Sequence, residues 1–171
     1  MQTAKRGVVF LAILAAASLA VAQTGKGPAK APPAAQPAHA PTKPADLKWT
    51  PIIPGAEIAV VSGNPDATGQ LFTIRFKMAD GTKVPPHWHP TDEHVTVLQG
   101  TFLVGMGEKF DAAGLNAMAT GAYMVVPKEM RHFAQSRGAT LVQVHGMGPF
   151  KIIWVNPADD PANKAAAAKK K

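Results

Sequence analysis

The chain has 171 residues, no cysteine, a formal net charge of +7 and a pI of about 9.8. The absence of cysteine excludes disulfides, thiolate metal ligands and a cysteine nucleophile. The basic excess lies outside residues 47–157, which hold nine Lys and Arg against eight Asp and Glu, a net charge of +1. Since a nucleic-acid-binding domain gathers its basic residues on a folded face, we expect no nucleic-acid partner.

Residues 1–22 have the pattern of an export signal. Lys5 and Arg6 precede an apolar run, and Ala20-Val21-Ala22 offers small residues for cleavage after Ala22. The run is shorter than the roughly 20 residues of a comfortable membrane span, so we expect no stable span after cleavage. An uncleaved N-terminal anchor is the alternative. Because no paired arginine precedes the run, we expect unfolded export and a periplasmic or secreted protein.

Two further segments have compositions unlike a globular core. Residues 23–46 are rich in Ala, Pro and Lys, and residues 158–171 are rich in Ala and Lys. Both contain too little apolar area to offset chain entropy, so we expect a disordered linker and a disordered tail. The remaining segment, residues 47–157, is long enough for a single domain.

Short β-type segments follow one another through residues 57–156. The clearest is residues 70–78, in which Phe72, Ile74, Phe76 and Met78 alternate with other residues and share one face. Similar segments bounded by Gly, Pro or Asp occupy residues 57–63, 93–100, 101–107, 122–127, 131–136, 140–146 and 150–156. Repeated short strands predict an all-β sandwich or small barrel. Residues 110–121 fit either a helical turn or a long hairpin loop.

Histidines and carboxylates gather in "PPHWHPTDEHVTVLQG", residues 85–100. On a strand, His87 and His89 point to one face, and Glu93 shares a face with Val95 and Val97 on the next strand. Two imidazoles and a carboxylate suit a first-row divalent metal ion. His132 is a plausible fourth ligand, which we expect to lie across the barrel from the other three.

The spacing of these residues resembles the cupin family. Gly81, His87, His89, Glu93 and Gly100 match its first motif without a gap, and Gly121, Pro127 and His132 fit its second motif. Two positions of the second motif differ: Glu129 stands for a glycine and Ser136 stands for an asparagine. The resemblance implies a single-domain, jelly-roll β-barrel over residues 47–157, often dimeric, with one metal held by His87, His89, Glu93 and His132.

Other residues near the motifs are assigned by strand alternation. His94 should point away from Glu93, toward the surface or a second subunit, and His145 fits a rim position as well as the pocket. Trp88 should face away from the two histidines that flank it. The candidates for the pocket lining are Phe76, Val95, Val97, Met106, Tyr123, Val125, Gln143 and His145.

An open site of this kind supports more than one function. It can serve a dioxygenase-like oxidoreductase that acts on a small organic molecule. The alternatives are a non-catalytic module that binds a sugar or a small acid, and an envelope protein that stores metal. For a nitrogen and oxygen site loaded outside the cytoplasm, we expect Cu or Zn on native purification, with Fe, Ni or Mn as the other candidates.

Overall fold

A long antiparallel sheet dominates the computed structural model, which describes residues 40–168. Its strands are β1 (Thr50–Ile53), β2 (Ala56–Gly63), β3 (Leu71–Met78), β4 (Lys83–Trp88), β5 (Glu93–Met106), β6 (Asn116–Ala119), β7 (Tyr123–Val126), β8 (His132–Met147) and β9 (Ile153–Trp154). The predicted signal and most of the predicted linker lie outside the described residues. Within residues 40–168, no helix has both the length and the apolar character to cross a membrane.

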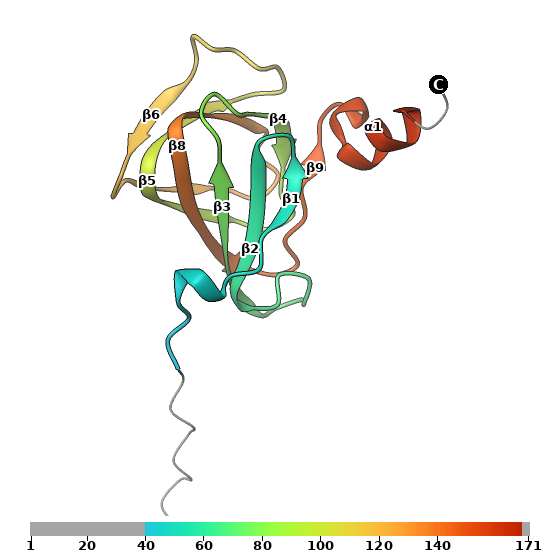
Figure 1. The fold of residues 1–171 in the computed structure, drawn as a ribbon. Helices are drawn as coiled ribbons and strands as arrows, with labels where there is room; N and C mark the ends of the chain where they lie inside the picture. Colours follow the sequence, from blue (N-terminus) through green and yellow to red (C-terminus); the bar gives the residue numbers. More distant parts are fainter. Residues whose placement is uncertain (1–39, 169–171) are drawn as a thin grey trace, which may run out of the picture. The chain divides into compact units, whose positions relative to one another are not determined.

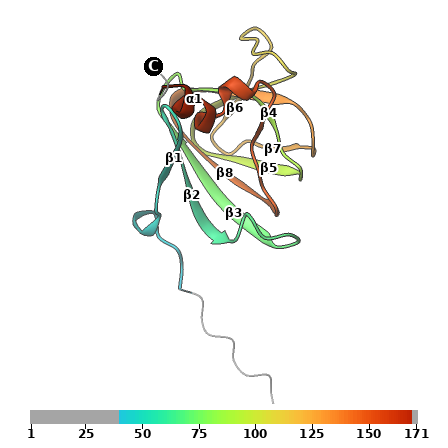
Figure 2. The ribbon, with the colours of Figure 1, turned by 90° about the vertical axis from the view of Figure 1, so that its right-hand side faces the viewer.

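The long strand β8 connects most of the sheet. Its second half pairs with β3, its first half pairs with β4, and β5 runs along its other edge. Beyond β3, the sheet continues through β2 to β1, and beyond β4 it continues to β9. The strands β6 and β7 pair with β5. The sheet curls into an open barrel, which Figures 1 and 2 show from two sides. The all-β jelly-roll prediction is confirmed.

β5 and β8 are both irregular near the middle of their pairing. The sequence predicted two strands in place of β5 and two in place of β8. Each pair is one continuous strand, because the chain bends at Gly100 and Gly138 without leaving the sheet. Both glycines have positive φ, and Gln99 pairs with Leu141 while Thr101 pairs with Arg137, so β8 carries two extra residues here. A Cβ at Gly100 would overlap the Ala139 carbonyl oxygen. Such bulges increase the local twist and help a sheet to close on itself.

The core lies between the inward faces of β3, β5 and β8. The predicted alternation of β3 is confirmed, with Phe72, Ile74 and Met78 buried and Phe76 partly buried. The buried side chains that pack against these from β5 and β8 are Val95, Val97, Phe102, Val104, Ala134, Val142 and Val144. Burying one Val, Leu, Ile or Phe side chain contributes about 1.5–3 kcal/mol, so this layer is the main source of the barrel's stability.

Three segments are resolved or corrected by the structure. Residues 110–121 contain no helix and comprise the end of the β5–β6 hairpin loop, β6 and the turn after it, and only Ile153–Trp154 of the predicted strand 150–156 is paired. The predicted disordered tail contains η2 (Pro157–Asp159) and α1 (Pro161–Ala168). Asp160 caps α1, because its Oδ1 accepts a hydrogen bond from the Ala162 amide at 2.8 Å. The segment is rich in alanine, which has the highest helix propensity, and it is capped. These two features favour a helix although the segment has little apolar surface to bury.

Ser136, which stands for the asparagine of the second motif, joins the turn before β4 to β8. Its hydroxyl accepts a hydrogen bond from the Thr82 amide at 2.9 Å and donates one to the Ala79 carbonyl. The side chain is 1% exposed, so water cannot replace these bonds. The Ser136 hydroxyl thus holds the turn before β4 against β8.

Replacing Ser136→Ala should lower the free energy of unfolding by about 1–3 kcal/mol, because two buried hydrogen bonds are lost. Urea denaturation of the metal-free protein measures this. The control is Ser62→Ala, since Ser62 is exposed at the end of β2, and it should change stability by no more than about 0.5 kcal/mol. Equal stabilities for the two variants would show that the Ser136 hydroxyl has no structural role.

Candidate metal centre

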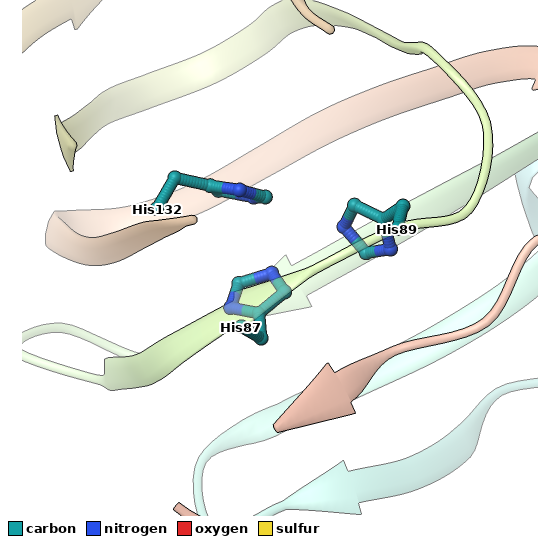
Figure 3. A group of neighbouring side chains, drawn as sticks. All are labelled: His87, His89 and His132. Atoms are coloured by element: carbon teal, nitrogen blue, oxygen red, sulfur yellow. The ribbon is translucent and has the colours of Figure 1, made fainter. Parts of the chain in front are cut away.

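Three histidines meet inside one end of the barrel (Figure 3). His87 is the fifth residue of β4, His89 follows the end of β4, and His132 begins β8 directly opposite His87. One nitrogen of each imidazole lies within 4.8 Å of the others, and all three side chains are buried. Their ring centroids are 4.2–5.3 Å apart. The sequence correctly placed His87 and His89 on one face.

Glu93, the first residue of β5, lies beside this cluster and is also buried. Its Oε2 is 3.3 Å from His132 Nε2 and 3.6 Å from His89 Nε2. One predicted detail is wrong: His132 does not lie across the barrel from the other residues. His132 pairs with His87 on the neighbouring strand β4, whereas the start of β5 pairs with the far end of β8, so it is Glu93 that approaches the histidines from across the interior.

The orientation of each imidazole is fixed by a backbone carbonyl. His87 Nδ1 bonds the Pro85 oxygen at 2.7 Å, and His132 Nδ1 bonds the Met130 oxygen at 3.0 Å. His89 Nδ1 bonds the Lys151 oxygen at 2.8 Å. A carbonyl can only accept, so Nδ1 carries the hydrogen in each ring. Each Nε2 is therefore the nitrogen that is free for the interior, which is the usual arrangement for metal-binding histidines.

His89 Nε2 is buried and has no hydrogen-bond partner among the described residues. A buried polar atom without a partner costs about 1–3 kcal/mol. A metal ion would bind this lone pair together with the Nε2 lone pairs of His87 and His132. The three-histidine cluster thus has the donor set and the geometry of a divalent-metal site.

Burial and mutual repulsion set the protonation of the cluster. Burial lowers the pKa of His87 to about 3, and the neighbouring His132 and His89 add to this effect. Burial also lowers the pKa of His89, although the charge of Glu93 opposes it. Both residues are therefore neutral near pH 7, which is the form in which histidine binds metal.

His132 and Glu93 behave as an ion pair in the metal-free protein. Burial opposes protonation of His132, but the hydrogen bond and charge of Glu93 outweigh it and raise the pKa of His132. Burial likewise opposes ionisation of Glu93, but the hydrogen bond from His132 and the nearby imidazoles outweigh it and lower the pKa of Glu93. A metal ion that takes the lone pair of His132 would displace the proton on Nε2.

A small apolar cavity of about 50 Å³ adjoins the cluster. Apart from the three histidines and Glu93, no titratable side chain lines it among the described residues. Its apolar lining is Ile52, Ile53, Ala56, Phe76, Met78, Val84, Val95, Phe102, Ala134, Val142, Val144, Ile152 and Trp154. One water needs about 10–15 Å³, so the cavity has room for only a few molecules of the size of water.

Of the eight predicted lining residues, the structure places Phe76 and Val95 at the cavity. Val97 is buried in the core without lining it. Met106, Tyr123 and Val125 are exposed, because β5 leaves the core at Met106 and β7 turns its other side chains inward.

Gln143 and His145 point outward from β8, so they also do not line the cavity. Gln143 Oε1 accepts a hydrogen bond from Arg75 Nε at 3.2 Å, and His145 stacks on His94. His94 points away from Glu93, as predicted.

The sequence did not identify the segment after β8 as part of the site. Phe150 stacks on His89 with ring centroids 4.3 Å apart, and Trp154 lies 5.6 Å from His87. The carbonyl of Lys151 holds His89. Ile152 and Trp154 share a strand face in the sequence, which was a usable signal, but their approach to β4 is a long-range contact that local patterns do not reveal.

The fold and the centre together define a cupin with a histidine cluster suited to metal. A family model described as the ChrR cupin-like domain matches residues 37–151, so the chain belongs to this family. No curated protein sequence matches the chain.

Several solved structures share the fold. KdgF from a Halomonas species is 20% identical with a TM-score of 0.51, over 64% of this chain and 94% of that one. The polyketide cyclase RemF from Streptomyces resistomycificus is 16% identical with a TM-score of 0.55, over 71% and 89%. Salicylate 1,2-dioxygenase from Pseudoaminobacter salicylatoxidans is 17% identical with a TM-score of 0.50, over 60% and 30%. At these identities the similarity establishes the fold alone.

Replacing His87 and His89 together with alanine should remove tightly bound interior metal, because two of the three converging nitrogens are lost. Elemental analysis after dialysis against a weak chelator measures this, and circular dichroism checks that the barrel is folded. Trp88→Phe is the matched control, since Trp88 lies between the two histidines and contacts Arg131 instead. If the double variant kept as much metal as the Trp88 variant, the cluster would not be the metal site.

Proposed function

We propose that the protein holds one divalent transition metal through His87, His89, His132 and Glu93 and acts as a dioxygenase-like oxidoreductase on a small organic substrate. The observation that carries this proposal is the unpartnered Nε2 of His89, which is buried beside two other imidazoles and a carboxylate. In a protein that bound no metal, this buried nitrogen would have no partner and would destabilise the fold by about 1–3 kcal/mol.

Each ligand has a distinct contribution. The three imidazoles supply borderline nitrogen donors, and Glu93 supplies one hard oxygen that also offsets part of the metal's charge. When bound, such a metal supplies activation of dioxygen or polarisation of a substrate oxygen. The four protein ligands leave open positions where small molecules can approach from the cavity.

The cavity favours chemistry that depends on the metal alone. Apart from the four ligands, its described lining offers no acid or base to move a proton. A dioxygenase whose substrate supplies all four electrons places both atoms of O₂ in that substrate and needs no outside reductant, so it suits a site without further polar groups. The similar barrel of salicylate 1,2-dioxygenase supports the view that this architecture can serve such a reaction.

The size of the cavity limits the substrate. About 50 Å³ accommodates O₂ and a reacting group, but not a whole ring system. The partly exposed side chains of the cavity lining are Ile52, Phe76, Val84, Ile152 and Trp154. The remainder of the substrate would contact partly exposed apolar side chains such as these, which favours an apolar or aromatic molecule.

Oxygen uptake by the Fe²⁺-loaded protein tests the activity. We expect a small aromatic or enolic substrate from a screened panel to consume one O₂ per molecule, with both oxygen atoms recovered in the product by ¹⁸O labelling. Glu93→Gln keeps the shape of the side chain but removes its charge, so uptake should fall at least about tenfold. Thr96→Ala is the control, because Thr96 points outward from the same strand.

A protein that binds metal and a small molecule without turning over would support the non-catalytic alternative. A sugar or a small acid that binds the metal-loaded protein, with no O₂ consumed, would be that result. Metal storage would be indicated if the protein released its metal readily and bound neither kind of molecule.

We further propose that the protein is exported unfolded and gains its metal outside the cytoplasm. The basis is the sequence pattern of residues 1–22. The mature chain should begin at Gln23, and the native protein should contain Cu or Zn more often than Mn, because site affinities rise toward Cu²⁺. N-terminal sequencing and elemental analysis of envelope-extracted protein check both points. An intact Met1 would contradict cleavage, and a preparation dominated by Mn would contradict loading after export.

A further inference from the structure

A second pair of histidines lies on the outer face of the same sheet. His94 on β5 and His145 on β8 occupy directly opposite positions of the two strands. Both are half-buried, and their ring centroids are 5.0 Å apart with an interplanar angle of 21°. The proposed metal centre uses neither residue.

We propose that His94 and His145 form a second, exterior site for a divalent transition metal ion. Two imidazoles that bind one ion at about 2.0–2.1 Å, with an angle of about 90–110° at the metal, have ring centres roughly 4.5–5.2 Å apart. The exterior pair falls in this range without any movement of the backbone. Among the interior pairs, His87 and His89 have the same 5.0 Å spacing, and the other two pairs lie at 4.2 and 5.3 Å. Rotation of the His145 ring about its Cβ–Cγ bond, which is a soft torsion in histidine, turns one of its nitrogens toward an ion shared with His94.

Tyr123 helps to decide which nitrogen of His94 binds. The Tyr123 hydroxyl lies 2.6 Å from His94 Nδ1. When Nδ1 carries the hydrogen and donates it to the Tyr123 oxygen, Nε2 is left with a free lone pair. This is the arrangement that carbonyls impose on the interior histidines, and a partner on the far nitrogen commonly strengthens metal binding. Tyr123 is thus a positioning residue of the exterior site.

The surroundings are open enough for an ion to enter and for water to complete its coordination. His94 and His145 border a surface groove together with Leu71, Asp92, Lys128 and Met147. The carboxylate and the ammonium group in this groove carry opposite charges, so the groove as a whole does not repel a cation. A site of two imidazoles and water follows the ordinary affinity order, in which Cu²⁺ binds best and Zn²⁺ and Ni²⁺ bind less tightly.

The exterior site is separate from the interior one although Glu93 and His94 are neighbours in the chain. Successive side chains of a strand point to opposite faces of the sheet. Glu93 is 7% exposed inside the barrel, whereas His94 contacts Tyr123 outside it. The two sites can therefore be removed one at a time.

Titration with Cu²⁺, followed by calorimetry and electron paramagnetic resonance, tests the proposal on protein purified without a polyhistidine tag. His39→Ala is included in every variant to remove the sixth histidine. We expect two bound equivalents in this background and one after His94→Ala or His145→Ala. The variant with alanine at both His87 and His89 should keep the exterior equivalent, with nitrogen hyperfine structure from two imidazoles. Tyr123→Phe should weaken exterior binding by about tenfold.

The matched control replaces Thr96 and Gln143 with alanine. These two residues form the outward-facing pair next along the same strands. This control should keep both equivalents and the wild-type affinity. The proposal is overturned if the His94 and His145 variants bind as much Cu²⁺ as the control, or if the background protein binds only the interior equivalent. Either result leaves the test of the interior centre unaffected.

Discussion

The hydrogen bonding of β8 along both of its edges is the constraint on which the barrel and its centre depend. This strand holds β4 on one side and β5 on the other, and the other three residues of the centre lie on these strands or directly after β4. The pairing of His87 with His132 fixes how far each imidazole reaches into the interior. A slip of one residue in this register would turn an entire strand's side chains to the opposite face. The site therefore exists only when the long-range pairing is correct.

The same architecture places four polar side chains where the surroundings are apolar. Each imidazole offsets part of its burial by a hydrogen bond to a carbonyl, and Glu93 offsets its own through His132. His89 Nε2 is the buried polar atom whose desolvation no hydrogen bond offsets among the described residues. Folded proteins tend to break their own packing rules at functional positions and to compensate elsewhere. Here the compensation is the dense layer of Val, Ile and Phe side chains below the centre.

Much of the fold and the members of the histidine cluster could be predicted because those signals are local. The alternation in residues 70–78 fixes the inward face of β3, and the spacing from Gly81 to Gly100 carries the cupin resemblance. The pocket lining was harder, because "YMVV" in β7 has four apolar residues in a row and no alternation. Only the pairing of Val95 with Met124 shows that Met124 and Val126 point inward while Tyr123 and Val125 point outward. The approach of Phe150 and Trp154 to the histidines is non-local for the same reason.

The alternation of β5 also gives the two proposed metal sites different physical properties. A metal at the interior centre would sit in a dry barrel end, where electrostatic interactions are strong and water cannot easily replace a ligand. A metal between His94 and His145 would remain in contact with the solvent, where exchange with free ions and chelators is rapid. The interior site is therefore suited to holding one ion through many encounters with substrate. The exterior pair, only one residue away along the chain, is suited to an ion that comes and goes with its concentration outside the barrel.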